Sequence, residues 1–271
     1  MTQRLAVLGH PVTHSRSPAM HNAALADLGL APEWSYEAME IPPGSFEERV
    51  MAMPGEGFVG ANVTVPHKGA ALAVASVPTE TAREIGAANT LTFAEGEVFA
   101  DNTDAPGLLD AIGRTPSGLR ALVLGAGGAA RAVVWALTRE GAAVEVWNRT
   151  ELRSMNLCEE LGGSVVSDPD PAGYELIVNS TSVGLGGEDP FVELPLREDG
   201  FAAGQIVVDM VYGEEPSRIL TTAEASGATL VDGIEILVRQ GARSLARWTG
   251  REPSLDVMRE AARGRGPHIA S

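Results

Sequence analysis

A lysine and an aspartate in the first half of the chain could together move a proton. Lys68 comes shortly after the apolar run Phe58–Val63, and Asp104 precedes a segment with helical spacing. Hydride transfer to a ketone builds negative charge on the oxygen, which a neighbouring ammonium group can stabilise and protonate. A carboxylate beside that lysine could orient it and accept a hydrogen bond from a substrate hydroxyl. The structural alternatives are a solvent-exposed Lys68 and a helix-capping Asp104.

Two serines follow the apolar run Arg4–Gly9, where a strand is expected to end. Ser15 and Ser17 are separated by a single residue, and two hydroxyls at this spacing suit a carboxylate or a polyol ligand. Ser17 followed by Pro18 is also typical of a helix N-cap and first helical residue. A capping role would explain Ser17 but not Ser15.

Further polar side chains follow the run Phe58–Val63. Thr64 comes directly after it, and Asn89 lies in the short polar segment Gly86–Thr90. Ligands of open α/β sheets bind beyond the carboxyl ends of the strands, so we expect these side chains to converge on one pocket. A role in turn formation is the alternative for Asn89 and for Asn102.

Apolar runs typical of buried strands alternate along the chain with longer segments of helical spacing. This alternation predicts an α/β fold with parallel sheets. Between residues 105 and 120 a loop-rich sequence gives way to a strand–glycine–helix unit, which indicates a second domain. Helical segments after Gly233 and over Pro253–Arg263 have no strand after them and could pack on either domain. The predicted strands are Arg4–Gly9, Ser35–Met39, Phe58–Val63, Ala121–Gly125, Val144–Trp147, Leu176–Asn179, Ile206–Met210 and Thr229–Val231.

The segment Gly125–Ala130 lies between a predicted strand and a predicted helix, which is the setting of a dinucleotide-binding fingerprint. Gly125 permits a tight turn, Gly127 lets the backbone approach a pyrophosphate, and Ala130 is the third small residue. The start of the following helix would face the phosphates. An ordinary glycine turn is the alternative.

The residues after Val144–Trp147 indicate which dinucleotide is bound. NAD enzymes place an acidic residue there against the ribose 2′-hydroxyl, whereas this chain has Asn148-Arg149-Thr150. An arginine with small polar neighbours suits a 2′-phosphate, which a carboxylate would repel. The expected cofactor is therefore NADP. Arg153 could add a second cation, and an exposed arginine beyond an N-cap at Thr150 is equally compatible with the spacing.

Composition limits the classes of partner. The 271 residues include 20 Lys+Arg and 36 Asp+Glu, a net charge of −16, so a nucleic-acid or anionic-membrane surface is not expected. Cys158 is the only cysteine, and no grouping of histidines and carboxylates has metal-ligand spacing, so no metal site is expected. The chain start has no apolar targeting segment, and we expect a cytoplasmic enzyme. His14 and His21 are interpreted as structural hydrogen-bond anchors.

Taken together, these segments resemble the shikimate dehydrogenase family over residues 9 to about 250. The matching motifs are Gly9-x-Pro11-x-x-His14-Ser15-x-Ser17-Pro18-x-x-His21-Asn22, Gly60-Ala61-Asn62-Val63-Thr64-Val65-Pro66-x-Lys68, Gly86-Ala87-x-Asn89-Thr90, Asn102-Thr103-Asp104, Gly125–Ala130, Asn148-Arg149-Thr150, Asn179-Ser180-Thr181-Ser182-x-Gly184, Asp209-Met210-Val211-Tyr212, and Gly233 with Gln240. Two places depart from the family: Gly213-Glu214-Glu215-Pro216 replaces an Asn-Pro-like turn, and Ile236 stands where a methionine is frequent.

The resemblance implies an α/β enzyme of two domains that reduces 3-dehydroshikimate to shikimate with NADPH, in chorismate and aromatic amino-acid biosynthesis. Residues 1–105 plus 240–271 would form an open α/β substrate domain to which the C-terminal helices return. Residues 106–239 would form a Rossmann-type NADP-binding domain. A monomer or a homodimer is expected, with no nucleic-acid or membrane partner.

The resemblance also implies roles for individual residues. Lys68 would donate and accept the proton, paired with Asp104. The substrate would be held by Ser15, Ser17, Thr64, Asn89, Asp104, Tyr212 and Gln240. NADP would contact Gly125, Ala126, Gly127, Gly128, Ala129, Asn148, Arg149, Thr150, Arg153, Met210 and Gly233, with Glu80 as a further candidate.

Three rival functions share parts of this pattern. An NAD-preferring quinate/shikimate dehydrogenase would carry an acidic residue in place of Asn148-Arg149-Thr150. A catalytically silent binding or regulatory paralogue would tolerate loss of Lys68 or Asp104, and both are present. A methylene-tetrahydrofolate dehydrogenase shares the plan of two domains, but the serine pair favours a small hydroxylated acid over a pterin.

Overall fold

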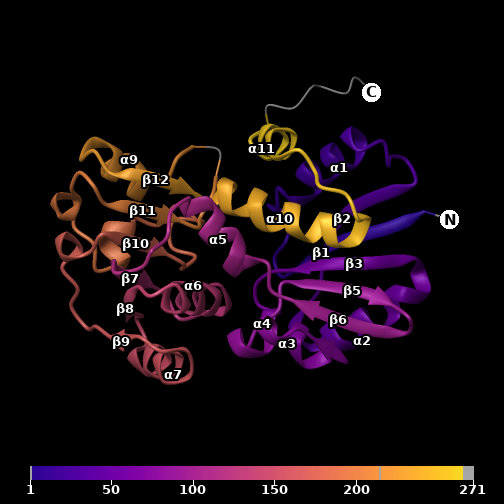
Figure 1. Cartoon of the computed structure of the whole chain (residues 1–271), viewed down its shortest axis with the longest axis horizontal. Coiled ribbons are helices and arrows are strands. Elements are labelled where there is room, and N and C mark those ends of the chain that lie inside the picture. Colours follow the sequence, from indigo (N-terminus) through magenta and orange to yellow (C-terminus); the bar gives the residue numbers. More distant parts are fainter. Residues whose placement is uncertain (1, 214, 265–271) are drawn as a thin grey trace. The chain divides into compact units, whose positions relative to one another are not determined.

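The computed structural model describes residues 2–213 and 215–264 and separates the chain into two units (Figure 1). The first unit runs to Thr103 and resumes at Leu237, and the second comprises Asp104–Ile236. Helix α10 (Gly233–Thr249) therefore begins in the second unit and continues in the first. Each unit has its own sheet, and the two are described separately below. Glu214, within the segment that departs from the family, lies outside the described residues.

The sheet of the first unit has the strand order β2-β1-β3-β5-β6-β4. The pairings of β1 with β2 and with β3 are parallel, whereas β5 is antiparallel to both β3 and β6. The prediction of parallel pairing is therefore wrong for the pairings of β5, whereas β4 and β6 pair in parallel. Positive φ angles at Glu95 and Gly96 make a tight hairpin turn between β5 and β6 that needs no helical crossover. The strands are β1 (Gln3–Gly9), β2 (Trp34–Glu40), β3 (Phe58–Val63), β4 (Val77–Pro78), β5 (Thr90–Ala94) and β6 (Glu97–Asp101).

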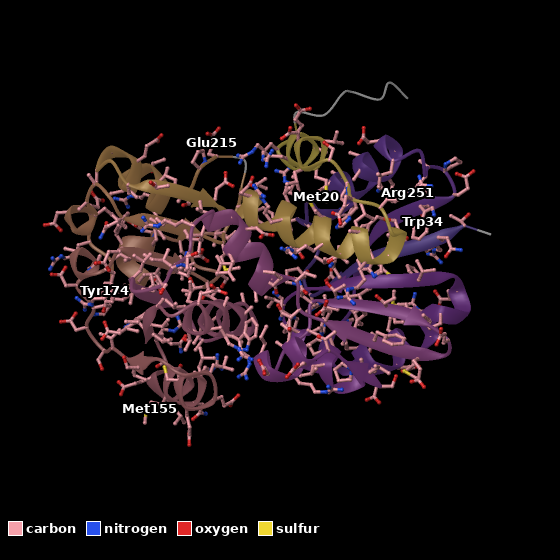
Figure 2. All side chains as sticks on the ribbon, in the orientation of Figure 1. Met20, Trp34, Met155, Tyr174, Glu215 and Arg251 are labelled. Carbon is pink, nitrogen blue, oxygen red and sulfur yellow. The ribbon has the colours of Figure 1, made fainter. Side chains whose placement is uncertain are left out.

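Helices cover this sheet, and the C-terminal helices belong to the same unit. Helix α11 packs against α1, and Met20 of α1 lies beside α10 (Figure 2). A Cβ on Gly241 of α10 would lie 2.5 Å from Cε of Met20. The return of the chain to the first unit, which the family resemblance implied, is confirmed. Besides α10, the helices are α1 (Ser17–Asp27), η1 (Pro43–Ser45), α2 (Phe46–Ala52), η2 (Met53–Glu56), α3 (Lys68–Val74), α4 (Glu80–Ile85) and α11 (Leu255–Ala262).

The sheet of the second unit has the order β12-β11-β10-β7-β8-β9, and its strand pairings among the described residues are parallel. Numbered within the unit, this is the order 3-2-1-4-5-6 of the dinucleotide-binding doubly wound fold, read from the opposite edge. The order reverses between β7 and β10, where such folds bind their ligand. The Rossmann-type prediction is therefore confirmed. The strands are β7 (Arg120–Leu124), β8 (Ala143–Trp147), β9 (Ser164–Val165), β10 (Leu176–Asn179), β11 (Ile206–Asp209) and β12 (Thr229–Asp232).

Both faces of the second sheet are buried. Val123 and Val178 belong to one apolar cluster, and Leu122 and Ile177, their neighbours in the strands, belong to the other. Cys158 packs against the first cluster as a small apolar residue. The helices are α5 (Asp104–Ile112), α6 (Gly128–Arg139), α7 (Glu151–Leu161), η3 (Pro171–Gly173), α8 (Pro190–Glu193), η4 (Glu198–Gly200) and α9 (Arg218–Ala225). Within residues 2–213 and 215–264, none of the helices has both the length and the apolar character of a membrane span.

Candidate functional site

The start of α1 brings the two predicted serines into contact. The Ser15 hydroxyl accepts a hydrogen bond from the backbone N–H of Ser17 at 3.2 Å. Ser17 is the first helical residue and is 4% exposed, while Arg16 occupies the N-cap position. The capping role considered for Ser17 is therefore wrong, because the helix begins one residue earlier than its sequence pattern predicts. Ser15 instead bonds the backbone at the helix start.

Thr64 lies where the carboxyl ends of β1 and β3 meet. Its N–H donates to the carbonyl of Leu8 at 2.8 Å, and a Cβ on Gly9 would lie 2.5 Å from its Cγ2. A glycine at position 9 therefore leaves room for the Thr64 side chain. Lys68 follows as the first residue of α3 and is only 9% exposed. The solvent-exposed alternative for Lys68 does not occur.

Asn89 lies beside Lys68 and the end of β3. The N–H of Ala88 donates to the Lys68 carbonyl at 2.9 Å, and the N–H of Val63 donates to the Asn89 carbonyl at 2.8 Å. The Asn89 side chain is buried. Two polar positions that follow β3 in the sequence, Lys68 and Asn89, are thus drawn to the end of that strand by backbone hydrogen bonds.

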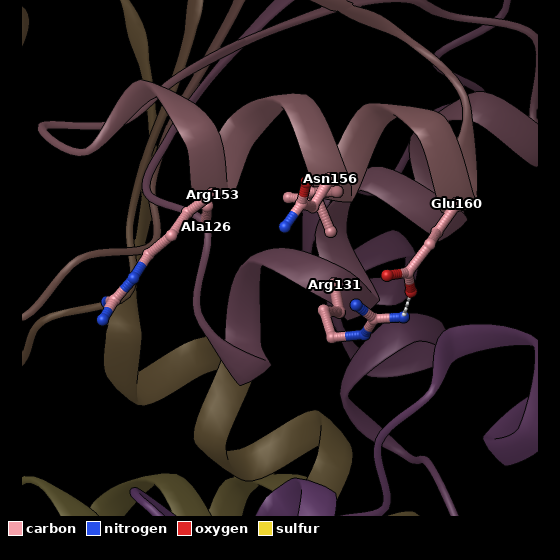
Figure 3. A pocket seen from close by; sticks show the side chains of 6 residues that line it. Ala126, Arg131, Arg153, Asn156 and Glu160 are labelled. Atoms are coloured by element: carbon pink, nitrogen blue, oxygen red, sulfur yellow. Dashed lines mark hydrogen bonds and ion pairs between the residues drawn. The ribbon is translucent and has the colours of Figure 1, made fainter.

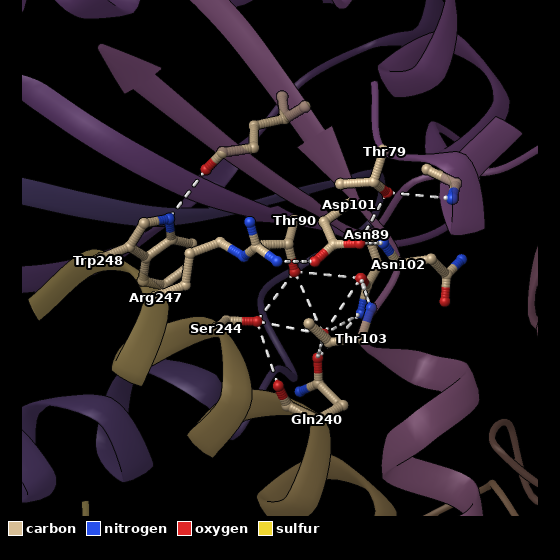
Figure 4. A network of polar contacts seen from close by, with 12 residues as sticks. Thr79, Asn89, Thr90, Asp101, Asn102, Thr103, Gln240, Ser244, Arg247 and Trp248 are labelled. Atoms are coloured by element: carbon tan, nitrogen blue, oxygen red, sulfur yellow. Dashed lines mark hydrogen bonds and ion pairs between the residues drawn. The ribbon is translucent and has the colours of Figure 1, made fainter. Parts of the chain in front are cut away.

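The Asn89 amide is the centre of a buried polar network (Figure 4). Its Nδ2 donates to Oγ1 of Thr103 and to Oε1 of Gln240, each at 3.0 Å, and the N–H of Thr103 donates to its Oδ1 at 2.7 Å. Asn89 and Gln240, both assigned to the substrate by the family resemblance, are in direct contact although 151 positions separate them. An amide bound on both sides has a defined orientation, which is what recognition of a hydroxyl requires.

Ser244, one helical turn beyond Gln240, extends this network (Figure 4). Its hydroxyl lies 2.9 Å from Nδ2 of Asn62 and from Oγ1 of Thr90, and 3.2 Å from Oγ1 of Thr103. Sequence reasoning missed both Thr103 and Ser244 as parts of the site. Thr103 belongs to a quoted motif and could have been found from it, whereas a serine inside a helix has no distinguishing pattern.

Trp248 fixes the end of α10 on the first sheet. Its Nε1 donates to the carbonyl of Leu91 at 3.0 Å. A Cβ on Gly60 would lie 2.2 Å from this nitrogen, so the glycine in β3 makes room for the indole. This approach of α10 to β3 and β5 places Gln240 against Asn89.

His21 is fully buried in the first unit and stacks on Tyr36, with ring centroids 4.1 Å apart and an interplanar angle of 5°. Neither ring nitrogen has a hydrogen-bond partner among the described residues, so the interpretation of His21 as a hydrogen-bond anchor is wrong. Burial lowers the pKa of His21 to about 3, and the ring is neutral at physiological pH. His21 is therefore an aromatic packing residue.

In the second unit, the glycine turn after β7 has the geometry that a pyrophosphate needs. Gly125 has a φ of 109°, and a Cβ there would lie 2.9 Å from Oγ of Ser180. A Cβ on Gly127 would meet no described heavy atom within 4 Å, so internal packing does not require that glycine. No side chain of the described residues caps the start of α6 at Gly128, and its N–H groups can meet an anion. The turn therefore fits a dinucleotide phosphate.

The Asn148-Arg149-Thr150 segment lies between β8 and α7. Nδ2 of Asn148 donates to the carbonyl of Thr150 at 2.9 Å and holds the turn. Thr150 occupies the N-cap of α7, although its hydroxyl accepts no capping hydrogen bond from the described backbone. Arg149 is exposed, and its guanidinium makes no ion pair within residues 2–213 and 215–264. The side chains of Arg149 and Thr150 are therefore available to a phosphate.

A hollow of about 310 Å³ lies between α6 and α7 (Figure 3). Nη2 of Arg131 lies 2.5 Å from Oε2 of Glu160 across it. Arg153, in the first turn of α7, also lines it, so the described lining contains two guanidinium groups and one carboxylate. This excess of positive charge suits an anion, and sequence reasoning missed the contribution of Arg131. The lining residues are Ala126, Arg131, Arg153, Asn156, Leu157 and Glu160.

Other predicted site residues have local structural roles. Asp104 is 7% exposed as the first residue of α5, where a carboxylate also interacts favourably with the helix dipole. A Cβ on Gly233 would lie 2.5 Å from the Met210 carbonyl, so the glycine lets the start of α10 approach the loop that carries Met210 and Tyr212. Glu80 is exposed in the first turn of α4, in the first unit. Across the described residues, no group of three His, Cys, Asp or Glu side chains could hold a metal ion.

Comparisons with known proteins identify related chains. The family model "Shikimate dehydrogenase substrate binding domain" matches residues 7–91, and the model "Shikimate 5'-dehydrogenase C-terminal domain" matches residues 233–263. A shikimate dehydrogenase (NADP(+)) of Thermus thermophilus is 46% identical over 266 residues, which cover 96% of this chain and 97% of that protein.

Solved structures show the same similarity. The shikimate 5-dehydrogenase of Thermus thermophilus in complex with NADP(H) and shikimate has a TM-score of 0.88 and 44% identity, covering 97% of this chain and 100% of that one. The shikimate dehydrogenase of Aquifex aeolicus has a TM-score of 0.89 and 37% identity, covering 97% of this chain and 98% of that one. The similarity therefore extends over both units.

Proposed function

The chain belongs to the shikimate dehydrogenase family, and from this premise we propose that it catalyses the reversible reduction of 3-dehydroshikimate to shikimate with NADPH. The observation in this chain that supports the proposal is the contact between Asn89 and Gln240. It joins two positions that the family assigns to the substrate, and a buried amide pair suits a polyhydroxylated ligand.

We propose that the substrate is held by the polar side chains that the family resemblance assigns to it. Ser15 and Ser17 would bind the carboxylate, since hydroxyls and a helix start both favour an anion. The groups that would bind the ring hydroxyls are Thr64, Asn89, Asp104, Tyr212 and Gln240.

NADP is the proposed cofactor, and when bound it supplies the hydride. The open space at Gly127 and the uncapped start of α6 fit its pyrophosphate. The exposed guanidinium of Arg149, with Thr150 beside it, fits a 2′-phosphate, and Arg153 adds a cation at the neighbouring hollow. The residues proposed to contact the cofactor are Gly125, Ala126, Gly127, Gly128, Ala129, Asn148, Arg149, Thr150, Arg153, Met210 and Gly233, with Glu80 as a further candidate.

Lys68 is proposed to move the proton of the reaction. In the reducing direction its ammonium group donates a proton to the carbonyl oxygen of the substrate and stabilises the charge that develops there. In the oxidising direction the neutral amine takes the proton back from the hydroxyl. Asp104 would accept a hydrogen bond from a substrate hydroxyl and orient the lysine. The low exposure of Lys68 supports this role, because a dry environment strengthens both interactions.

The test is the initial rate of nicotinamide reduction with shikimate, measured with NADP and with NAD and repeated with quinate. We expect a fast rate with shikimate and NADP only. Activity with NAD or quinate would move the chain to the broader quinate/shikimate group. Absence of activity under every condition would favour the silent paralogue and contradict the proposal.

The state of association and the cellular location extend this proposal. A monomer or a homodimer is compatible with a site built from one chain, and light scattering of the purified protein would distinguish them. A cytoplasmic location stays a prediction, which fractionation of the source cells would test.

A further inference from the structure

Asp209, the last residue of β11, carries a buried carboxyl group that the proposed chemistry does not use. It is 1% exposed, and Oδ1 accepts hydrogen bonds from Nδ2 of Asn179 at 2.9 Å and from the N–H of Val211 at 3.1 Å. Oδ2 has no hydrogen-bond partner among the described residues. Burial raises the pKa of this carboxyl, while the two hydrogen bonds to Oδ1 oppose that rise. Burial of a carboxyl group costs free energy, so we expect its hydrogen bonds to have a structural or functional role.

The first contact connects Asp209 to the loop that follows β10. Oδ1 of Asn179 accepts from both the N–H and the hydroxyl of Thr181, at 3.1 and 2.7 Å. The hydroxyl oxygen of Thr181 in turn accepts from the N–H of Val183 at 3.1 Å. The amide orientation of Asn179 is therefore determined on one side by a carboxylate and on the other by two donors. Loss of the Asp209 acceptor would therefore disturb the orientation of the Asn179 amide, which holds this loop.

The same loop contacts the glycine turn. The Ser180 hydroxyl donates to the carbonyl of Leu124 at 2.7 Å, directly before Gly125. A Cβ on Gly125 would lie 2.9 Å from that hydroxyl and 3.1 Å from Cγ2 of Thr181. The loop after β10 and the turn after β7 thus lie on the two sides of the point where the strand order reverses.

The second contact of Asp209 holds the loop that carries Met210 and Tyr212. Val211 is bound through its N–H, and Gly233 packs against the backbone on the other side, with a Cβ position only 3.0 Å from the Val211 carbonyl. The loop is therefore held on one side by the hydrogen bond to Asp209 and on the other by the backbone of Gly233. Asp209 thus joins the loops after β10 and β11, and through Ser180 it reaches the turn after β7.

We propose that Asp209 is a positioning residue for the cofactor, which sets the relative placement of the Ser180–Val183 loop, the Met210–Tyr212 loop and the glycine turn through its hydrogen bond to Asn179. The inference rests on the proposed function, because these loops matter through the dinucleotide that they would contact. Asp209 itself is not proposed to touch substrate or cofactor. Its effect is on affinity for NADP and on turnover, through loop placement.

Removal and conservative replacement of the carboxyl group provide the test. Asp209→Ala removes the oxygen that accepts from both Asn179 and Val211. Asp209→Asn keeps an amide oxygen that can accept both hydrogen bonds, with its N–H₂ at the position of Oδ2, and is the variant expected to retain the loop positions. Asp168→Asn, at an exposed aspartate of the same unit, controls for the change in charge.

The dissociation constant of NADP is measured by calorimetry and kcat with shikimate by initial rates, both well below the unfolding temperature of each variant. We expect Asp209→Ala to weaken NADP binding about tenfold or more, the effect of losing buried charged hydrogen bonds, and Asp209→Asn to keep most of the wild-type affinity. The KM for shikimate changes little. Wild-type affinity in Asp209→Ala, or equal losses in Asp209→Ala and Asp209→Asn, would overturn the inference.

Failure of the proposed function would look different. If the wild-type chain binds NADP but does not turn over shikimate, the binding measurements still test Asp209. If it binds no NADP at all, both the proposed function and the inference fail.

Discussion

Replacement of His21 by phenylalanine should remove a specific part of the acid sensitivity of this protein. His21 is fully buried, its ring nitrogens have no described hydrogen-bond partner, and burial lowers its pKa to about 3. The unfolded chain takes up a proton on this ring near the ordinary histidine pKa of about 6.5, whereas the folded protein does not. The stability due to neutral His21 is therefore fully present above a pH of about 6.5 and is lost as the pH falls toward 3.

The magnitude follows from these two pKa values. Between pH 7 and pH 5 the unfolded state gains about 2 kcal/mol from protonation of His21, while the folded state gains almost nothing. Phenylalanine keeps a ring to stack on Tyr36 and cannot be protonated, so His21→Phe should lose about 2 kcal/mol less unfolding free energy over this interval than the wild type. Removal of two unsatisfied nitrogens should also leave the variant at least as stable near pH 5.

The assay is urea unfolding of both proteins at pH 7, 6 and 5, followed by tryptophan fluorescence. His14→Gln, at an exposed histidine of the same unit, is the matched control and should retain the wild-type pH dependence. Equal losses of unfolding free energy in the wild type and in His21→Phe would refute the reasoning. That result would mean that the buried ring is protonated in the folded protein at pH 5.

Three further changes test the site, and a fourth tests the packing of α10 on the first sheet. Lys68→Ala should lower kcat by a factor on the order of 10² or more with little change in the KM for shikimate, and near-wild-type turnover would contradict its role as proton donor. Arg149→Ala should raise the KM for NADP by roughly tenfold or more without raising that for NAD, and equal effects on both would exclude a 2′-phosphate contact. Thr103→Val should raise the KM for shikimate and cost about 1–3 kcal/mol in urea unfolding, while Thr103→Ser should retain most of both properties because it keeps the hydroxyl. Gly60→Ala should lower the unfolding temperature measured by circular dichroism, because its Cβ would collide with Trp248, and an unchanged value would show that the indole can move aside.

The apolar strands were predictable because their signal is local. Strands such as β7 and β10 are covered on both faces, so they read as continuous apolar runs in the sequence. The β5–β6 hairpin was not predicted. Its turn is Glu95-Gly96 rather than the usual Asn-Gly or Asp-Gly, and its strands mix polar and apolar residues.

The capping prediction failed for a similar reason. Ser17 followed by Pro18 fits an N-cap, but the hydroxyl of Ser15 binds the Ser17 N–H and the helix begins one residue earlier. Caps depend on backbone geometry within one turn, which composition alone does not determine.

By itself, the sequence determined the α/β class, the glycine turn at Gly125, the arginine at position 149 and the family, because each depends on residue type and spacing over a short segment. Only the tertiary structure decided that Asn89 contacts Gln240 and that Asp209 joins two loops. These contacts join residues far apart in the chain, so they exist only after α10 has packed on the first sheet and the strands of the second have paired. Hydrogen bonding at short range leaves a pattern in the sequence, whereas hydrogen bonding across a fold is set by packing.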